Sequence, residues 1–444
     1  MKKEHLFLIV FGLIFVTIAV VFLTFPRSTF SKVERRELKT FPSYSHEKLR
    51  SGEYATEVSS WFSDSEPYRD ELMQLSMMLK ENMGLKWQDD EEQITFHEST
   101  PGNSLIPADA AQAEPGDQRD IKAFDGEIAD EKTHTAEAGI LIVGSVPKIR
   151  ALINYGGSPQ GGSSYAAMVN EYKAKLGKEV NVYCMIIPTA IEFYCPPKVR
   201  AGSKRIKQEL PTIKNVYGKL RDDVKAVDVY TVLGKHVNEP IYLRTDHHWA
   251  PLGAHYAAGA LASVAGVPFR PLSDYNQKTI HDFVGTMFGY SKDASVQQSP
   301  EDFVYYVPKD DSYVTTVTQF KLDKDFRITG EMPACRGQFF HNFKDGSSQA
   351  YSVFMGGDAM IVKVRTGVKN GRRLVIMKDS YGNAVPSNLF GSFEEVHVVD
   401  FRYFPKNIVK YVRDNKITDL AFCNNVFIAV SESAVKNYRD MLTN

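Results

Sequence analysis

The sequence predicts an α/β protein with a mostly parallel sheet flanked by helices. From Gly139 onward, short apolar or β-branched runs alternate with segments of helical periodicity, and strands that alternate with helices form βαβ units. The chain has 444 residues, 43% of them hydrophobic, which is enough for one large domain or two ordinary ones. A formal charge of -1 excludes a polybasic nucleic-acid-binding protein.

The predicted elements follow one another in a regular order. Strands are expected at short apolar runs, and helices where apolar residues recur every three or four positions. Pro251 opens one helix, at a position where its missing N–H does no harm. The predicted strands are 140–143, 180–187, 227–230, 373–378, 396–400 and 419–423, and the predicted helices are 163–176, 209–224 and the one that begins at 251.

The N-terminus carries a long apolar segment. Residues 6–25 are apolar except for Gly12, Thr17 and Thr24, and as a helix they would be ~30 Å long, the thickness of the hydrocarbon core of a bilayer. The alternative is a cleaved signal peptide, but the run exceeds the ~7–15 residues of a typical h-region, and no small-x-small cleavage site follows. We therefore predict a transmembrane signal anchor, preceded by a cytoplasmic tip at 1–5.

The rest of the chain divides by composition. Residues 26–87 are polar with apolar residues at helical spacing, as expected of a helical stalk. Residues 88–137 are rich in Asp, Glu, Ala, Gly and Pro, which is typical of a flexible acidic insertion. Residues 138–444 form the predicted main domain. Within it, residues 268–350 lack clear periods and are expected to be an insertion or a small β-rich subdomain.

The cysteines give little sign of a special site. The four of them show no C-x-x-C spacing, which argues against zinc-finger and thioredoxin-type sites. Cys184 and Cys195 could bridge a short loop in an oxidising compartment, whereas Cys423 lies in an apolar run, as is typical of a buried small side chain.

Two short motifs carry candidate chemistry. RTDHHW at 244–249 places Asp246 two residues before His248, and KDSYGN at 378–383 places Ser380 just beyond a predicted strand. A serine nucleophile needs a base to take its proton, and the base needs an acid to fix its tautomer. In a turn, the Asp246 carboxylate can accept the Nδ1 proton of His248 and leave Nε2 as the base. Both motifs are expected beyond the carboxyl ends of strands, where reactive groups gather.

Each motif also has a plainer interpretation. An Asp-x-His pair is more often a surface or helix-start pair than a catalytic one, and Ser380 could be an N-cap. A serine there still lies beside the N–H groups of a helix N-terminus, which can stabilise an oxyanion. Asp246, His247 and His248 are possible metal ligands, but adjacent histidines rarely converge on one ion, so neither a metal nor another cofactor is predicted. Trp249 is expected to hold the loop by packing.

These motifs resemble those of a known family. RTDHHW followed by a Pro-Leu-Gly-Ala helix resembles the signature of the bacterial DHHW family, which is similar to the SGNH-hydrolase-like proteins that O-acetylate alginate and other exopolysaccharides. In those relatives an Asp-x-His-Trp segment precedes a Lys/Gly-Asp-Ser segment, the reverse of the ordinary SGNH order, and this chain has the same permuted order. Segments 31–42 and 61–70 also resemble the family's stalk. The resemblance covers most of the chain except 88–137 and much of 268–350.

The resemblance implies a flavodoxin-like fold of the SGNH-hydrolase type, with permuted motif order. Carried over residue by residue, it implies Ser380 as nucleophile, His248 as base and Asp246 as orienting acid. In ordinary SGNH enzymes the loops after the next two strands supply a glycine N–H and an asparagine to the oxyanion hole, but the first of these loops has no glycine here. Oxyanion or substrate binding is then expected of Arg402, Asn424 or Asn425, and Tyr381.

The expected activity is transfer or hydrolysis of an O-linked acetyl group on a cell-envelope or extracellular polysaccharide, through an acyl-serine. The resemblance also implies a single-pass inner-membrane protein with a periplasmic main domain, and a membrane-bound O-acyltransferase that supplies acetyl groups. The positive-inside rule opposes this topology, because two lysines precede the apolar run and five basic residues follow it before residue 40. The alternative is a non-catalytic SGNH-like scaffold or glycan-binding subunit of an envelope polysaccharide assembly.

Overall fold

The computed structural model describes residues 20, 24–25, 27, 29–31, 36–69, 119, 121–126, 128, 131–310, 312–323 and 327–443. These described residues fall into two compact units. The smaller holds those up to Arg69 together with Lys292–Ala294, and the larger holds the rest. Most of the apolar run, and with it the predicted signal anchor, lies outside the described residues. Within them, no helix combines the length and the apolar character needed to cross a membrane.

The smaller unit contains short elements in the segment predicted to be a stalk. Its helices in the described part are α2 (His46–Ser51) and α3 (Glu53–Asp64), and a short strand pair, β1 (Phe30–Ser31) with β2 (Arg36–Glu37), precedes them. Gly52 joins the two helices with φ 80°, a left-handed conformation that glycine adopts without steric cost.

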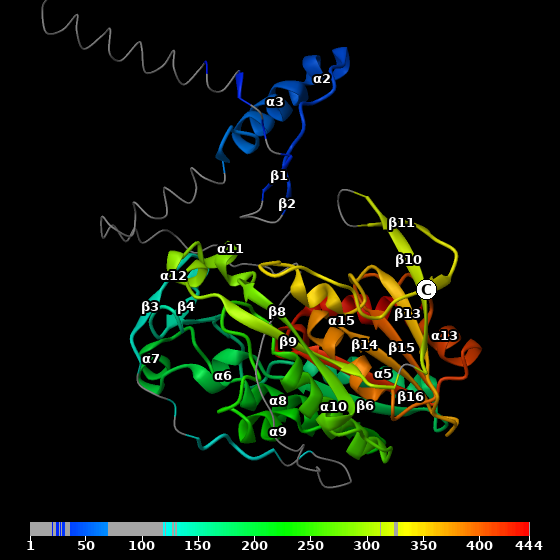
Figure 1. Ribbon diagram of the computed structural model, residues 1–444. Coiled ribbons are helices and arrows are strands. Elements are labelled where there is room, and N and C mark those ends of the chain that lie inside the picture. Colours follow the sequence, from blue (N-terminus) through cyan, green and yellow to red (C-terminus); the bar gives the residue numbers. More distant parts are fainter. Residues whose placement is uncertain are drawn as a thin grey trace, which may run out of the picture. The chain divides into compact units, whose positions relative to one another are not determined.

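Among the described residues, a nine-stranded sheet forms the centre of the larger unit (Figure 1). Its strands are β6 (Asn181–Ile187), β7 (Val224–Ala226), β10 (Val314–Leu322), β11 (Ile328–Glu331), β12 (Cys335–Gly337), β13 (Met360–Arg365), β14 (Arg373–Lys378), β15 (Glu395–Asp400) and β16 (Asp419–Asn425). Five run parallel in the order β15-β14-β16-β6-β7. Beyond β15, β13, β10 and β11 continue the sheet antiparallel, and β12 pairs with β10. The predicted parallel sheet is therefore the centre of a mixed sheet.

Helices cover both faces of the parallel strands. After residue 130, the described helices are α5 (Ser163–Leu176), α6 (Ala190–Tyr194), α7 (Pro197–Gly202), α8 (Leu210–Gly218), α9 (Val229–Lys235), α10 (Pro251–Ala265), α11 (Met287–Ser291), α12 (Ala294–Gln297), α13 (Ile408–Asp414), α14 (Val426–Ala429) and α15 (Glu432–Asp440). Tyrosines of α5 and α15 pack against Phe422 of β16 on one face. On the other face, Arg372 bonds both Asp419 of β16 and the last carbonyl of α10. Because Asp419 and Phe422 are three residues apart on β16, their side chains point to opposite faces of the sheet.

Several predicted elements agree with the structure and two do not. The helix predicted at 163–176 is α5, the helix from Pro251 is α10, and four of the predicted strands are β6, β14, β15 and β16. The strand predicted at 227–230 is wrong, because β7 ends at Ala226 and the Asp228 carboxylate accepts from the Thr231 N–H at 2.8 Å, which caps α9. The helix predicted at 209–224 is too long, since α8 ends at Gly218.

The start of the domain also differs from the prediction. The strand expected at 140–143 is present as β4 (Leu141–Val143), but it pairs antiparallel with β3 (Thr133–Thr135) and β5 (Arg150–Leu152), outside the central sheet. Ile121 is 1% exposed and belongs to the core. The described residues at the end of the predicted flexible insertion are therefore folded onto the domain. They include the apolar Ile121 and the β-forming residues of β3.

The irregular segment at 268–350 is not a separate subdomain. It contains a two-stranded antiparallel pair, β8 (Tyr275–Phe283) with β9 (Glu301–Pro308), and then the strands β10 to β12, which extend the central sheet. It is β-rich, as expected. Its strands were hard to recognise because their exposed faces carry polar residues, so the apolar runs are interrupted.

All four cysteines lie in the described part of the chain and are free thiols. The bridge considered between Cys184 and Cys195 is therefore not formed. Cys423 is buried, as predicted, and burial raises the pKa of its thiol well above the ordinary value.

Gly253 lets α10 approach the backbone of the preceding loop. A β-carbon there would lie 2.5 Å from the carbonyl oxygen of Ile241, an atom that moves only with the chain. We expect Gly253→Ala to lower the free energy of unfolding by about 1–3 kcal/mol, as overpacking does. Urea unfolding measures this change.

The matched control is Gly259→Ala in the same helix. Its β-carbon would meet the edge of the Phe269 ring at 3.1 Å, and a side chain can shift. The gain in helix propensity of about 1 kcal/mol should then offset the contact. Equal stability of the two alanine variants would show that the backbone approach at Gly253 is not tight.

His255 of α10 couples stability to pH. It is 0% exposed, and its Nδ1 lies 2.9 Å from Oδ1 of Asn388. Burial lowers the pKa of His255 from 6.5 to about 4, and the bond to Asn388 opposes this only in part. The folded protein therefore binds fewer protons than the unfolded chain, so stability present above about pH 6.5 is lost as the pH falls toward 4.

We expect the wild-type protein to lose about 2 kcal/mol more unfolding free energy than His255→Met between about pH 7.5 and about pH 5. Chemical unfolding of both proteins at the two pH values measures the difference. Parallel losses in the two proteins would mean that His255 is not held neutral by the fold.

Candidate functional site

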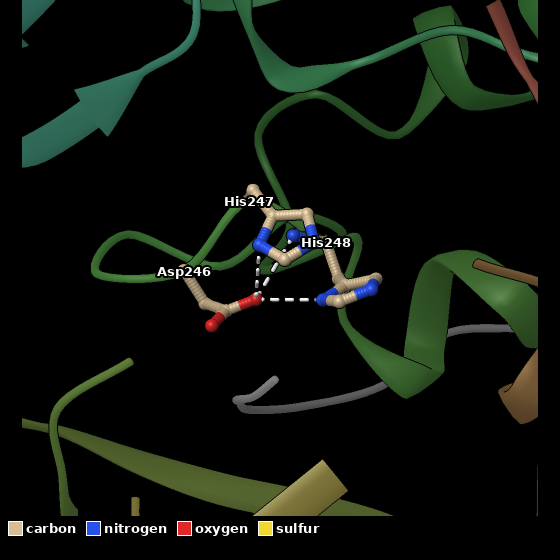
Figure 2. A group of neighbouring side chains, drawn as sticks. All are labelled: Asp246, His247 and His248. Carbon is tan, nitrogen blue, oxygen red and sulfur yellow. Dashed lines mark hydrogen bonds and ion pairs between the residues drawn. The ribbon is translucent and has the colours of Figure 1, made fainter. Parts of the chain in front are cut away.

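The Asp-His-His-Trp segment lies in a closed loop directly before α10. Tyr242 and Trp249 form a β-bridge across the loop, which turns the chain back on itself. Oδ1 of Asp246 accepts from Nδ1 of His248 at 2.7 Å and from the His248 N–H at 3.1 Å (Figure 2). Because a carboxylate accepts, Nδ1 carries the proton and Nε2 is left as the acceptor.

Ser380 begins a short 3₁₀ turn, η4 (Ser380–Ala384), at the carboxyl end of β14. Asp379 caps this turn by accepting the Tyr381 N–H at 2.8 Å, so Asp379, and not Ser380, is the N-cap. Oγ of Ser380 lies 2.7 Å from Nε2 of His248. The structure thus brings the three residues Asp246, His248 and Ser380 together in one series of hydrogen bonds. Ser380 and His248 are 0% exposed.

The Asp246 carboxyl is held in its charged form. Burial by itself would raise its pKa, but the charge of His247 and the hydrogen bonds from His248 and Thr286 outweigh that effect and hold the pKa of Asp246 well below its usual range. A buried carboxylate that stays charged can stabilise an imidazolium at His248.

The second oxygen of Asp246 is held by a segment that sequence reasoning missed. The N–H and the hydroxyl of Thr286 donate to Oδ2 at 2.8 Å and 2.7 Å. The same hydroxyl lies 2.8 Å from Nδ1 of His247. A β-carbon on the preceding Gly285 would lie 2.4 Å from Cβ of Asp246, so this approach requires glycine. The only sequence signal was a glycine in an aromatic, irregular segment.

Glu301 of β9 fixes the start of the loop. Oε1 accepts from the N–H and the hydroxyl of Thr245, both at 2.7 Å, and from the Arg244 N–H at 3.0 Å. Burial raises the pKa of Glu301 to about 7, although Arg244 and the bonds from Thr245 lower it. Like Thr286, Glu301 lies in the segment 268–350, which therefore supplies support for the site.

Trp249 and Tyr381 tie the two motifs together. Trp249 is 0% exposed, which confirms the packing role predicted for it, and its Nε1 donates to the Tyr381 carbonyl at 2.9 Å. The Tyr381 hydroxyl donates to the carbonyl of His247, and its N–H bonds Asp379. Both donors of Tyr381 bond the loops that carry the motifs, and the oxyanion or substrate contact expected of this residue stays a prediction.

The two asparagines predicted for the oxyanion hole also have structural partners. Oδ1 of Asn424 accepts from the hydroxyls of Tyr165 and Tyr438, and its Nδ2 donates to Oδ2 of Asp379 at 3.1 Å. The N–H of Asn425 donates to the same oxygen at 2.8 Å, and its side chain caps α14. These bonds hold Asp379, and through it the turn that carries the serine. In this structure the two asparagines hold the serine turn, and the oxyanion contact expected of them stays a prediction.

Arg402 belongs to a buried ion cluster beside Ser380. Nη2 of Arg402 lies 2.7 Å from Asp400 and 3.0 Å from Asp358, and Nζ of Lys378 lies 2.8 Å and 2.6 Å from the same two residues. Burial would lower the pKa of Lys378, but Asp358 and Asp400 raise it above its ordinary value. The two cations and two carboxylates balance one another. The guanidinium forms these ion pairs, and the oxyanion or substrate contact expected of Arg402 stays a prediction.

A metal ion is the competing use of the histidine motif. Asp246, His247 and His248 each offer a ligand atom, and these atoms lie within 4.8 Å of one another (Figure 2). A tetrahedral zinc ion with bonds of about 2.0–2.1 Å would hold its ligand atoms roughly 3.3 Å apart. Nδ1 of His248 and Oδ1 of Asp246 are only 2.7 Å apart, in a direct hydrogen bond. The arrangement fits a proton relay better than a metal site.

Comparisons with known proteins agree with the resemblance. A family model described as DHHW protein matches residues 125–399. A DHHW family protein of known structure from Eubacterium siraeum is 39% identical, with a TM-score of 0.62 over 72% of this chain and 100% of that one. Bacillus cereus PatB1, solved with a sulfonyl adduct, is 17% identical, with a TM-score of 0.51 over 69% and 99%, which is a likeness of fold alone. A search of curated proteins finds no match.

The buried ion cluster should stabilise the fold strongly. The Lys378 side chain is 2% exposed, so Lys378→Met leaves two carboxylates with one cation in a largely buried cluster. We expect a loss of about 3–5 kcal/mol in unfolding free energy. Lys363→Met is the matched control, because Lys363 pairs with Glu395 at 3.0 Å but is 31% exposed. It should lose less than about 1 kcal/mol. Urea unfolding compares them, and similar losses would contradict the role of the cluster.

Proposed function

We propose that this chain, which belongs to the DHHW family, is a serine-dependent enzyme that moves acetyl groups on or off a cell-envelope or extracellular polysaccharide. The observation that carries the proposal is the series from Asp246 through His248 to Ser380, with both hydrogen bonds at 2.7 Å. His248 can take the serine proton while Asp246 stabilises the resulting imidazolium.

The reaction has two half-reactions. In the first, Oγ of Ser380 attacks the carbonyl of an acetyl ester while Nε2 of His248 takes the serine proton. The imidazolium then gives this proton to the leaving alcohol oxygen, and an acetyl-serine remains. In the second, a sugar hydroxyl attacks the acetyl-serine, His248 takes the hydroxyl proton, and the proton returns to Oγ as the acetyl sugar leaves. Water in place of the sugar gives acetate.

The site is closed to bulk solvent in this state. Ser380 and His248 are 0% exposed and Asp246 is 1% exposed, so bulk water does not surround the nucleophile in this state. A site that excludes water protects a reactive acyl-enzyme from hydrolysis. A closely packed serine also suits a small acyl group better than a long chain. The acetyl group and the polysaccharide acceptor themselves come from the family resemblance of the two motifs.

The same resemblance supports a location and a partner. We propose a periplasmic domain on a single-pass anchor formed by residues 6–25, with acetyl groups supplied by a membrane-bound O-acyltransferase. A non-catalytic glycan-binding scaffold is the alternative. It would not need Asp246, His248 and Ser380 in one bonded series, so the geometry favours the enzyme.

The test uses the full chain in detergent, with an activated ester such as p-nitrophenyl acetate and an acetylated glycan as substrates. We expect Ser380→Ala to lower kcat/KM by about 10³-fold or more, since the covalent route is lost. An aryl sulfonyl fluoride should label Ser380 in the wild-type protein, and peptide mass mapping locates the adduct.

Ser387→Ala is the control, because Ser387 is also buried, at 1% exposed, and lies in the next turn, η5 (Pro386–Leu389). It should keep wild-type activity and labelling. No turnover and no labelling of the wild-type protein would count against a serine mechanism, and full activity of Ser380→Ala would remove Ser380 from it.

A further inference from the structure

Tyr351 contacts both halves of the site from outside either motif. It lies in the 3₁₀ turn η3 (Ala350–Val353) and is 0% exposed. Its ring stacks on the imidazole of His248, with 4.5 Å between centroids and 23° between planes. Its hydroxyl lies 3.1 Å from the carbonyl oxygens of Ser380 and of Tyr381. One side chain thus contacts the base and the turn that carries the nucleophile.

We propose that Tyr351 is a positioning residue for the acyl-transfer reaction: its ring holds the His248 imidazole in line between Asp246 and Ser380 and stabilises the imidazolium formed during attack. This proposal rests on the proposed function. It adds a residue that neither motif contains and that the family resemblance did not assign.

The stacking fixes the one rotation that the relay depends on. Turning the imidazole about its bond to Cβ would move Nδ1 away from Asp246 and Nε2 away from Ser380 together. A ring packed flat against the imidazole opposes that rotation. Misplacement of a reacting group by about 1 Å can lower a rate by about 10²-fold, so the orientation of this ring bears directly on catalysis.

The stacking also bears on charge. The face of an aromatic ring carries negative electrostatic potential, and a cation over it is stabilised, more strongly where water is excluded. His248 becomes a cation when it takes the serine proton, and Tyr351 lies against its ring in a buried site. The ring of Tyr351 therefore favours the protonated base.

The segment that carries Tyr351 is itself firmly held. The His341 N–H donates to the Val353 carbonyl at 2.8 Å, and the Met355 N–H donates to the Phe339 carbonyl at 2.6 Å. Three residues beyond Met355, Asp358 bonds Lys378 at 2.6 Å.

Asp358 also accepts from Nδ2 of Asn383 at 3.0 Å. Lys378 and Asn383 lie on either side of Ser380 in the chain. The segment 351–358 therefore contacts the serine turn and its flanks at two places, through the hydroxyl of Tyr351 and the carboxylate of Asp358.

The test compares Tyr351→Leu, which keeps apolar cover but loses the ring, with Tyr351→Phe, which keeps the ring. In the full chain, with p-nitrophenyl acetate, we expect Leu to lower kcat about 10-fold to 100-fold with KM within about twofold. The acid limb of the pH profile of kcat/KM should shift to lower pH, because the imidazolium loses support. Tyr351→Phe keeps the ring, so most of kcat and the position of the acid limb should stay as in the wild-type protein.

Tyr172→Leu is the matched control. Tyr172 is also 0% exposed and its hydroxyl donates to a carbonyl, that of Tyr438, at 2.7 Å, but it lies on α5 away from both motifs. It should lower the unfolding free energy without moving the acid limb or kcat. Tyr351→Met replaces the leucine variant if that protein does not fold.

The outcomes separate the two proposals. If the wild-type protein turns over esters and Tyr351→Leu keeps both its kcat and its acid limb, this role of Tyr351 is wrong while the serine mechanism stands. A lowered kcat with an unmoved limb, matched by Tyr172→Leu, would likewise mean that Tyr351 only packs. Absence of both turnover and sulfonyl labelling in the wild-type protein would reject the serine mechanism and this role together.

Discussion

The buried carboxylate of Asp246 is the group on which the rest of the site depends. It accepts four bonds, two at Oδ1 from the side chain and the N–H of His248, and two at Oδ2 from the N–H and the hydroxyl of Thr286. A charge without water is tolerated only when its hydrogen-bonding capacity is met. These four hydrogen bonds fix the tautomer of His248, and they join the loop before α10 to the segment after β8. The four bonds therefore fix the geometry and, together with the charge of His247, keep the carboxylate ionised.

A second buried carboxylate organises the nucleophile in the same way. Asp379 accepts from the N–H of Tyr381, from Nδ2 of Asn424 and from the N–H of Asn425. These donors come from the serine turn itself and from the end of β16, the strand beside β14. Because parallel strands end at the same edge of the sheet, a short side chain can reach both. Each of the two motifs is thus held by a buried carboxylate, Asp246 in the histidine loop and Asp379 in the serine turn. Trp249 links the two motifs.

How much could be predicted depended on the range of the contacts. Asp246, His248 and Ser380 were found because each motif is local and follows a strand, and the central strands were found because they are buried apolar runs. Thr286, Glu301 and Tyr351 were missed because they lie within or directly after the segment 268–350, which lacks periodicity and is separated from both motifs in the sequence. Arg402 and Asn424 were also named, but their partners Asp400 and Asp379 were not foreseen. These partners depend on which charged and polar groups come together in three dimensions, and spacing in the sequence does not give that information.

Charge balance also bears on the proposed proton relay in this buried site. Lys378 and Arg402 are matched by Asp358 and Asp400, so the cluster beside the serine adds no net charge. Separating charge is expensive where water is absent, and an imidazolium formed alone there would be strongly disfavoured. Formed at His248, it instead becomes one half of an ion pair with a carboxylate 2.7 Å away. The Asp246 carboxylate therefore offsets the positive charge that the proposed proton transfer would place on His248, while the negative charge passes to the carbonyl oxygen that Ser380 attacks.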